Sequence, residues 1–287
     1  MQDLHTEIDS NVKQALVEDI GAGDLTASLI PGDKELSASV VSREDAVLCG
    51  VQWFEACFLA LSSDTTVHWF AKDGDTVQAG YKLCEIKGQA RALLSAERSA
   101  LNFLQMLSAV ATQTKYFVDA INGTQAVIVD TRKTLPGLRL AQKYAVKCGG
   151  GINHRFGLYD GILIKENHII AAGGITAALR KAQEIVPPGG FIQIEVESLQ
   201  ELQEALTAGA GMVLLDNFTL AQLSDAVALA RQQTGDQVLL EASGNMTLEN
   251  VRQVAETGVD RISIGSLTKN IRAIDLSMRF SGVKEKF

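Results

Sequence analysis

Six short apolar segments in the second half of the chain, separated by stretches long enough for helices, constrain the fold more than any other feature. The apolar segments lie at 126–129, 161–164, 191–194, 212–215, 238–240 and 261–264. The stretches between and after them that have helical spacing lie at 136–147, 174–186, 198–208, 219–233 and 247–257. Because strands that alternate with helices form a parallel sheet through right-handed crossovers, we predict an α/β fold.

A β/α barrel is favoured over an open dinucleotide-binding sheet, although the pattern leaves open whether the sheet closes. The glycine-rich runs at 21–23 and 149–153 do not follow a predicted strand, so we interpret each as a turn. The sequence contains no phosphate-binding motif of the P-loop type and no HExxH zinc motif.

The residues that follow the predicted strands are unusually polar. Ionisable side chains occur at five successive strand ends, at 130–133, 165–168, 195–197, 216–217 and 241–245. The chemistry of a parallel β/α barrel lies at the carboxyl ends of its strands. The ends at 243–245 and 265–268 are rich in small residues, whose backbone N–H groups suit a phosphate. We therefore predict a barrel mouth with cations, two carboxylates and a phosphate-binding loop.

The charge of the chain reverses locally around this mouth. The whole chain has a formal net charge of −8, which argues against a general nucleic-acid-binding protein. Between residues 130 and 168, however, seven Lys or Arg residues face only three acidic ones. We interpret this window as a pocket for a small, multiply anionic ligand, with a chance cluster of surface lysines as the alternative. Lys143 and Lys147 are interpreted as a solvated helix face.

The first part of the chain has a different pattern, typical of an α+β domain. We expect a helix at 8–20, a strand at 36–48, a helix at 51–61, a strand–turn–strand at 68–90, and one or two helices at 93–121. The 287 residues correspond to about two domains at roughly 150 residues each.

The four cysteines form no CxxC pair, and the N-terminus is polar and acidic. We expect a cytoplasmic protein with reduced thiols, no signal peptide and no membrane partner.

The segment DTRKTLPGLRLAQKYAVKCGGGINHRFGLYDGILIKENHI at 130–169 closely resembles the quinolinate phosphoribosyltransferase family of NAD biosynthesis. The resemblance extends over 18–26, 97–112, 194–201, 208–217, 240–247 and 257–268. It implies an N-terminal α/β sandwich domain over 1–107 and an incomplete β/α (TIM-like) barrel over 108–287. The tail, from about 268 to 287, is expected to pack back on the first domain.

The resemblance also implies an activity. A pentosyltransferase of this family joins quinolinate to 5-phosphoribosyl 1-pyrophosphate with Mg²⁺, giving nicotinate mononucleotide, pyrophosphate and CO₂. It implies a homodimer or larger homo-oligomer in which the neighbouring N-terminal domain covers the barrel mouth. Quinolinate carries two adjacent carboxylates. Arginine can donate two parallel hydrogen bonds to a carboxylate, which lysine cannot.

Residue by residue, the resemblance implies three groups of contacts. Quinolinate is expected to contact Arg132, His154, Arg155, Lys165 and the partner's Arg98, with Thr131 in the same motif. Lys133, Glu195 and Asp216 are expected to be catalytic, with Glu195 and Asp216 also holding ribose hydroxyls and Mg²⁺ through water. The 5′-phosphate is expected at Ser243, Gly244, Asn245, Ile264, Gly265 and Ser266.

The sequence departs from the family pattern at three positions, and three other functions are alternatives to this hypothesis. Gly211, Asn245 and Ala109 stand where the family commonly has Asp, Gly and Gly, and Asn245 borders the expected phosphate loop. The rivals are a related enzyme for another ring acid, a lipoyl- or biotinyl-type carrier suggested by 72–88, and a barrel that binds a phosphorylated ligand without catalysis. The intact TRK, NHR and LIK elements favour the quinolinate hypothesis.

Overall fold

The computed structural model describes residues 4–281, and it divides the chain into two compact units. Of the described residues, unit 1 contains 4–115, 135–150 and 269–281. Unit 2 contains 116–134 and 151–268. The chain therefore passes between the units several times, and each unit is built from segments far apart in the sequence.

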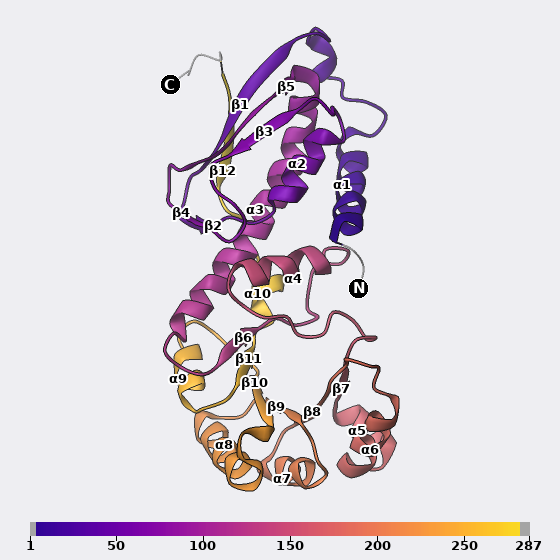
Figure 1. Ribbon diagram of the computed structural model, residues 1–287, viewed down its shortest axis with the longest axis vertical. Helices are drawn as coiled ribbons and strands as arrows, with labels where there is room; N and C mark the ends of the chain where they lie inside the picture. Colours follow the sequence, from indigo (N-terminus) through magenta and orange to yellow (C-terminus); the bar gives the residue numbers. More distant parts are fainter. Residues whose placement is uncertain (1–3, 282–287) are drawn as a thin grey trace. The chain divides into compact units, whose positions relative to one another are not determined.

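Unit 1 is an antiparallel sheet packed against helices. Its four-stranded sheet has the order β12-β1-β5-β3, from Leu276–Phe280, Glu35–Ser42, Lys82–Gln89 and Thr66–Trp69. Figure 1 shows α2 (Val51–Leu59) and the long α3 (Ala90–Ala120) along this sheet, beside α1 (Leu4–Ile20). The aromatic ring of Phe54 meets that of Trp69 edge-on, with centroids 5.3 Å apart. This contact between the buried Phe54 and the half-buried Trp69 holds α2 on the sheet.

Two stretches of unit 1 differ from the sequence prediction. The single strand expected at 36–48 is divided into β1 and the short β2 (Ala46–Val47), which pairs with β4 (Thr76–Val77). A turn causes the break, because the Ser42 hydroxyl donates to the carbonyl of Glu44 at 2.6 Å. The helix α4 (Arg139–Cys148), expected as a barrel crossover, packs with α1 in unit 1 instead.

Unit 2 is the parallel β/α barrel that the alternating pattern predicts, with one open side. The six strands have the order β6-β11-β10-β9-β8-β7, and every neighbouring pair is parallel. They are Val127–Val129, Arg261–Ser263, Leu239–Ser243, Met212–Asp216, Ile192–Val196 and Ile162–Ile164. Since β6 and β7 are the two edges, the sheet is not closed, and the α/β fold with an incomplete barrel is confirmed.

Helices cover the outside of this sheet (Figure 1). They are α5 (Glu166–Ala172), α6 (Ile175–Ile185), α7 (Leu199–Thr207), α8 (Leu220–Thr234) and α9 (Val251–Glu256). The short helix α10 (Ser266–Lys269) follows β11, and single 3₁₀ turns lie at Ala27–Leu29 and Gly235–Gln237. The sequence analysis missed α5. This helix begins directly after the strand end at Lys165, whose N–H donates to the His168 ring at 3.0 Å.

None of the helices within 4–281 is long and apolar enough to span a bilayer.

Candidate active site

A cavity of about 290 Å³ lies at the carboxyl ends of the barrel strands. Its lining residues come from five of the six strands, from the segments that follow β6 and β7, and from the segment 151–155. They are Thr131, Arg132, Lys133, His154, Arg155, Leu163, Lys165, Glu195, Leu214, Glu241, Ser243 and Ser263. This is the end at which β/α barrels place their chemistry. A volume of this size suits a small ligand.

Three cationic side chains, Arg132, Arg155 and Lys165, form one wall of the cavity, called here the cation wall. Arg155 is its most informative member. Its side chain is buried, at 9% exposure, and its guanidinium donates to the carbonyl of Gly161 at 3.0 Å. Burial, and next the positive charge of Arg132, lower the pKa of Arg155, while Asp160 opposes the shift. Within residues 4–281, Arg155 has no carboxylate in ion-pair contact. An anion placed between Arg132 and Arg155 would relieve their mutual repulsion.

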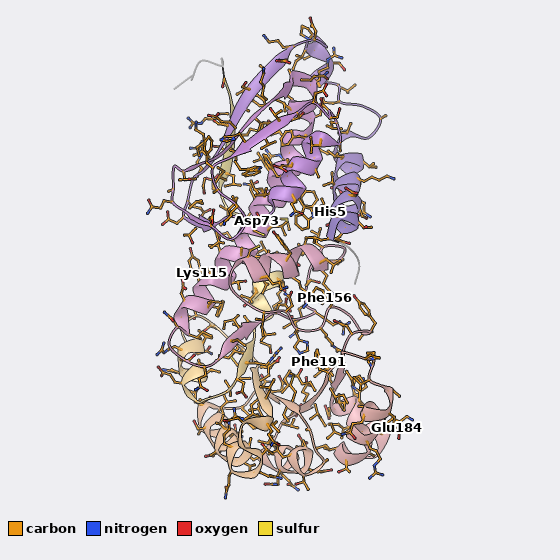
Figure 2. All side chains as sticks on the ribbon, viewed as in Figure 1. His5, Asp73, Lys115, Phe156, Glu184 and Phe191 are labelled. Atoms are coloured by element: carbon orange, nitrogen blue, oxygen red, sulfur yellow. The ribbon has the colours of Figure 1, made fainter. Side chains whose placement is uncertain are left out.

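His154 is fixed in one tautomer beneath this wall. Its Nδ1 accepts the backbone N–H of Arg155 at 2.8 Å, so the proton of the neutral ring lies on Nε2. Nε2 is 2.7 Å from Oε1 of Gln193 and 3.8 Å from Oε1 of Glu241. The ring also meets Phe191, labelled in Figure 2, edge-on at 5.3 Å. The orientation of His154 is therefore set by the barrel interior, and its ring in turn fixes the backbone at Arg155.

Glu241 and Gln193 form a fully buried polar floor under His154. Glu241 accepts Nε–H of Arg261 at 2.9 Å through Oε2, so its charge is compensated. Among the residues that the structure describes, Oε1 of Glu241 and Nε2 of Gln193 find no hydrogen-bond partner. Buried polar atoms of this kind are usually paired, so this floor has hydrogen-bonding capacity left for water or for a ligand.

The two expected metal-holding carboxylates lie on neighbouring strands. Glu195 lies near the end of β8, and its Oε2 accepts Nζ–H of Lys165 at 2.9 Å. Asp216 ends β9 and accepts from the Asn217 amide at 2.8 Å. Because β8 and β9 are adjacent and parallel, both carboxylates face the same edge of the sheet. Two acids without a complete set of protein ligands suit Mg²⁺, which keeps several waters and shares its remaining positions with substrate phosphates.

The ends of β10 and β11 carry the small residues expected to bind phosphate. Gly244 has φ +108°, and a Cβ there would overlap the side chain of Asn217, so only glycine fits. Asn245 also has a left-handed backbone, with φ +39°, which asparagine tolerates. A Cβ on Gly265 would lie 3.1 Å from Cδ of Lys133. The Lys133 side chain therefore passes directly over this glycine.

The structure brings many of the sequence-predicted residues to the cavity wall and leaves others beside it. Those on the wall are Thr131, Arg132, Lys133, His154, Arg155, Lys165, Glu195 and Ser243. Those that follow the same strand ends without lining the cavity are Asp216, Gly244, Asn245, Ile264, Gly265 and Ser266. Arg98 is exposed on α3 in unit 1, next to a separate cavity of about 140 Å³ that Glu18, Asp19 and Asn102 also line.

Sequence reasoning missed several lining residues. Leu163, Leu214 and Ser263 lie inside strands and face the cavity, but nothing in their residue types marks them as site residues. Glu241 belongs to the polar strand end at 241–245, but it is not among the residues expected to contact a substrate. The available signal was a polar residue inside an apolar strand, as with Gln193 in FIQI and Glu241 after VLL. Such residues need a buried partner, which only the fold identifies.

The family model of the quinolinate phosphoribosyl transferase N-terminal domain matches residues 24–108, and that of the C-terminal domain matches residues 110–279. The probable nicotinate-nucleotide pyrophosphorylase [carboxylating] of Bacillus subtilis is 40% identical over 274 residues, covering 96% of this chain and 93% of that protein. The corresponding Mycobacterium leprae enzyme is 41% identical, covering 93% and 95%.

A solved structure agrees with these sequence relatives. The nicotinate-nucleotide pyrophosphorylase of Francisella tularensis superposes with a TM-score of 0.92 at 43% identity, covering 96% of each chain. The likeness therefore extends over both units and is not confined to the barrel.

Proposed function

The chain belongs to the quinolinate phosphoribosyltransferase family, and we propose that it is the enzyme that joins quinolinate to 5-phosphoribosyl 1-pyrophosphate in NAD biosynthesis. The products are nicotinate mononucleotide, pyrophosphate and CO₂. The observation that carries this proposal is the buried Arg155, which lies beside Arg132 and lacks a carboxylate partner within residues 4–281. A ligand with two adjacent carboxylates supplies the negative charge that Arg155 lacks.

The cation wall performs the first task, which is to hold quinolinate. The guanidinium groups of Arg132 and Arg155 offer paired donors to the carboxylates, and Lys165 adds a charge that Glu195 positions at 2.9 Å. His154 is held by its own neighbours in the tautomer that carries its proton on Nε2, so it contributes a fixed ring and not a mobile proton. Fixing the ring acid in this way presents its nitrogen in one orientation.

The opposite side of the mouth would hold the phosphoribosyl group. Backbone N–H groups at 243–245 and 264–266 suit the 5′-phosphate, and Lys133 lies over Gly265 where it can meet the pyrophosphate. Glu195 and Asp216 would hold the ribose hydroxyls and Mg²⁺. When bound, Mg²⁺ supplies positive charge to the departing pyrophosphate.

The reaction needs orientation and electrostatics and no covalent nucleophile from the protein. As pyrophosphate leaves C1, positive charge develops on the ribose and the pyridine nitrogen attacks. The quaternised nitrogen then accepts electron density when the neighbouring 2-carboxylate is lost as CO₂, and a proton replaces it on the ring. Arg132 and Arg155 hold the reacting ring throughout, and Lys133 balances the charge of the leaving group.

We also propose that the working enzyme is a cytoplasmic homodimer or larger homo-oligomer with shared sites. All four cysteines are free, which fits a reducing compartment. Arg98 is exposed and lies outside the unit that contains the cavity, as expected for a side chain that serves a neighbouring copy. Co-expression of Arg98→Ala and Arg132→Ala chains tests this, because about a quarter of the sites in random dimers would regain both residues. Absence of any recovered activity would contradict sharing.

The activity itself is tested by a product assay. The purified protein is mixed with Mg²⁺, 5-phosphoribosyl 1-pyrophosphate and, in separate tubes, quinolinate, nicotinate or nicotinamide. Mononucleotide is followed by mass spectrometry and released CO₂ by isotope. We expect product and CO₂ from the quinolinate tube alone. A folded protein that gives no product in that tube would overturn the proposal.

Two variants then divide the site into its expected halves. Arg132→Ala is expected to raise KM for quinolinate, while Glu195→Ala is expected to lower kcat and to weaken 5-phosphoribosyl 1-pyrophosphate binding. Equal effects of both variants on both substrates would contradict the assignment of the two halves.

A further inference from the structure

Two cysteines in unit 1 lie close together although they are far apart in the sequence. Cys49 directly precedes Gly50, the residue that caps α2, and Cys148 is the last residue of α4. Their sulfurs and a carboxylate oxygen of Asp73, labelled in Figure 2, all lie within 4.8 Å of one another. None of these residues lines the barrel cavity or takes part in the proposed reaction.

The two thiols differ in exposure and in acidity. Cys49 is completely buried, whereas Cys148 is half-buried and is followed by Gly149 and Gly150. Burial raises the pKa of Cys49 well above its usual range. A hydrogen bond from the Cys49 thiol lowers the pKa of Cys148, against the opposing effects of burial and of the Asp73 charge. Cys148 is therefore the more acidic of the two thiols as well as the more accessible one, so it is the sulfur that ionises first.

Asp73 is held in place by other groups. One of its oxygens accepts the backbone N–H of Val51 at 3.1 Å, and the other accepts the Tyr144 hydroxyl at 2.8 Å. Even with a carboxylate oxygen of Asp73, this cluster offers three ligands, one fewer than the four of a structural zinc site. The geometry therefore favours a dithiol over a metal site.

We propose that Cys49 and Cys148 are a redox modification site at which a hydroperoxide closes a reversible disulfide. In the first step the Cys148 thiolate attacks the peroxide oxygen, giving a sulfenic acid and, after protonation, an alcohol or water. In the second step the Cys49 sulfur attacks the Cys148 sulfur; its thiol proton and the hydroxyl group leave as water. A dithiol reductant reverses the bond by thiol–disulfide exchange.

The other two cysteines serve as internal controls. Cys57 and Cys84 are completely buried, and burial raises the pKa of each to about 12. Neither belongs to the three-residue cluster found within residues 4–281. They supply almost no thiolate at neutral pH and should remain reduced under the same treatment.

The disulfide would act on a segment that leads to the cavity. The chain continues from Cys148 through three glycines to His154 and Arg155. A disulfide between Cys148 and Cys49 would fix the last residue of α4 to the start of α2. It would therefore restrict the backbone motion of the glycine segment that follows Cys148. The modification site is independent of the proposed reaction, and its test needs no substrate.

The experiment treats the reduced full-length protein with hydrogen peroxide in slight excess, blocks remaining thiols with iodoacetamide, and analyses the digested protein by mass spectrometry. We expect a peptide that links Cys49 to Cys148, lost again after dithiothreitol, with Cys57 and Cys84 alkylated only on unfolding. Cys57→Ser, the matched control, should form the link as the unmodified sequence does. Cys148→Ser should abolish the oxidation, and Cys49→Ser should leave a sulfenic acid on Cys148 that dimedone labels.

Three outcomes would overturn the proposal. The first is a folded protein in which Cys148 stays reduced or is oxidised to sulfinic acid without a link to Cys49. The second is a link from Cys148 to a cysteine other than Cys49. The third is one zinc ion per chain in metal analysis of the purified protein, since both sulfurs would then be ligands.

Discussion

The two ends of the barrel differ in the partners of their arginines. At the end where the strands begin, Arg231 donates to Asp260 at 2.7 Å and to the carbonyl of Val238 at 2.9 Å. At the mouth, Arg155 is more deeply buried and lies beside Arg132, and its guanidinium donates to the carbonyl of Gly161 at 3.0 Å. The Arg231 charge is neutralised by a carboxylate, whereas Arg155 has no carboxylate within ion-pair distance among residues 4–281.

The ion pair between Arg231 and Asp260 connects several elements at the start of the strands. Asp260 also accepts the backbone N–H of Leu240 at 2.7 Å, so the Arg231 ion pair joins α8 to β10 and β11. A paired charge of this kind stabilises the fold, while repulsion between Arg132 and Arg155 weakens it slightly. Mutations at the two ends should therefore separate activity from stability.

The largest expected effect follows from removing a charge at the mouth. Arg155→Met should lower kcat/KM for quinolinate by about three orders of magnitude, since loss of one partner in a buried charged contact costs about 4 kcal/mol. The free energy of unfolding should be unchanged or higher, because the repulsion with Arg132 is removed. Steady-state kinetics and urea denaturation of the same preparation measure both. A large loss of stability would show that Arg155 is structural.

A second prediction concerns the small-residue side of the mouth. Gly244→Ala should raise KM for 5-phosphoribosyl 1-pyrophosphate about tenfold, because the new Cβ overlaps Asn217 and φ +108° costs about 1–3 kcal/mol. Gly211→Ala is the matched control, since nothing lies within 4 Å of its Cβ position and its φ is not in the left-handed region. Similar kinetics for the two variants would contradict a restrictive loop at 243–245.

A third prediction tests the opposite end of the barrel. Arg231→Met should lower the free energy of unfolding by about 1–2 kcal/mol, because Asp260 loses a half-buried charged partner. Its kcat/KM should stay within about twofold of the unmodified protein, as expected for a change distant from the strand ends where chemistry takes place. Denaturation midpoints and kinetics again provide the measurement. A large fall in kcat/KM at full folding would remove the contrast between the two ends.

The smallest effect is expected at Asn245. Asn245→Gly should change stability by less than about 1 kcal/mol, because both residues tolerate the left-handed φ of +39°. Asn250 donates to the Asn245 carbonyl at 3.1 Å, a backbone contact that survives the change. KM for 5-phosphoribosyl 1-pyrophosphate should shift less than about threefold unless the Asn245 amide itself contacts the phosphate. A tenfold rise in KM would assign that role to the side chain.

The barrel strands could be predicted from sequence to within one or two residues at their starts. The apolar runs at 212–215 and 261–264 correspond to Met212–Asp216 and Arg261–Ser263. This works because buried parallel strands are short and apolar on both faces, while the helices between them have a different period. The same reasoning located the strand ends that meet at the cavity, because the carboxyl ends of parallel strands share one edge.

Other features depend on partners that no local pattern identifies. Lys143, interpreted as part of a solvated helix face, is completely buried, because α4 packs inside unit 1 and is not an outer crossover helix. The short α5 was missed because its cap is supplied by His168 and not by a usual capping residue. The division of the strand at 36–48 likewise depended on a turn contact of Ser42.

The sequence by itself determined the alternation of strands and helices, the cation-rich strand ends and the family, because these depend on local period and on long specific motifs. Only the tertiary structure decided which buried groups meet: His154 with Gln193, Glu241 with Arg261, and Cys49 with Cys148. The physical reason is that burial makes a polar group depend on its partner, and partners distant in the chain are brought together only when the core packs.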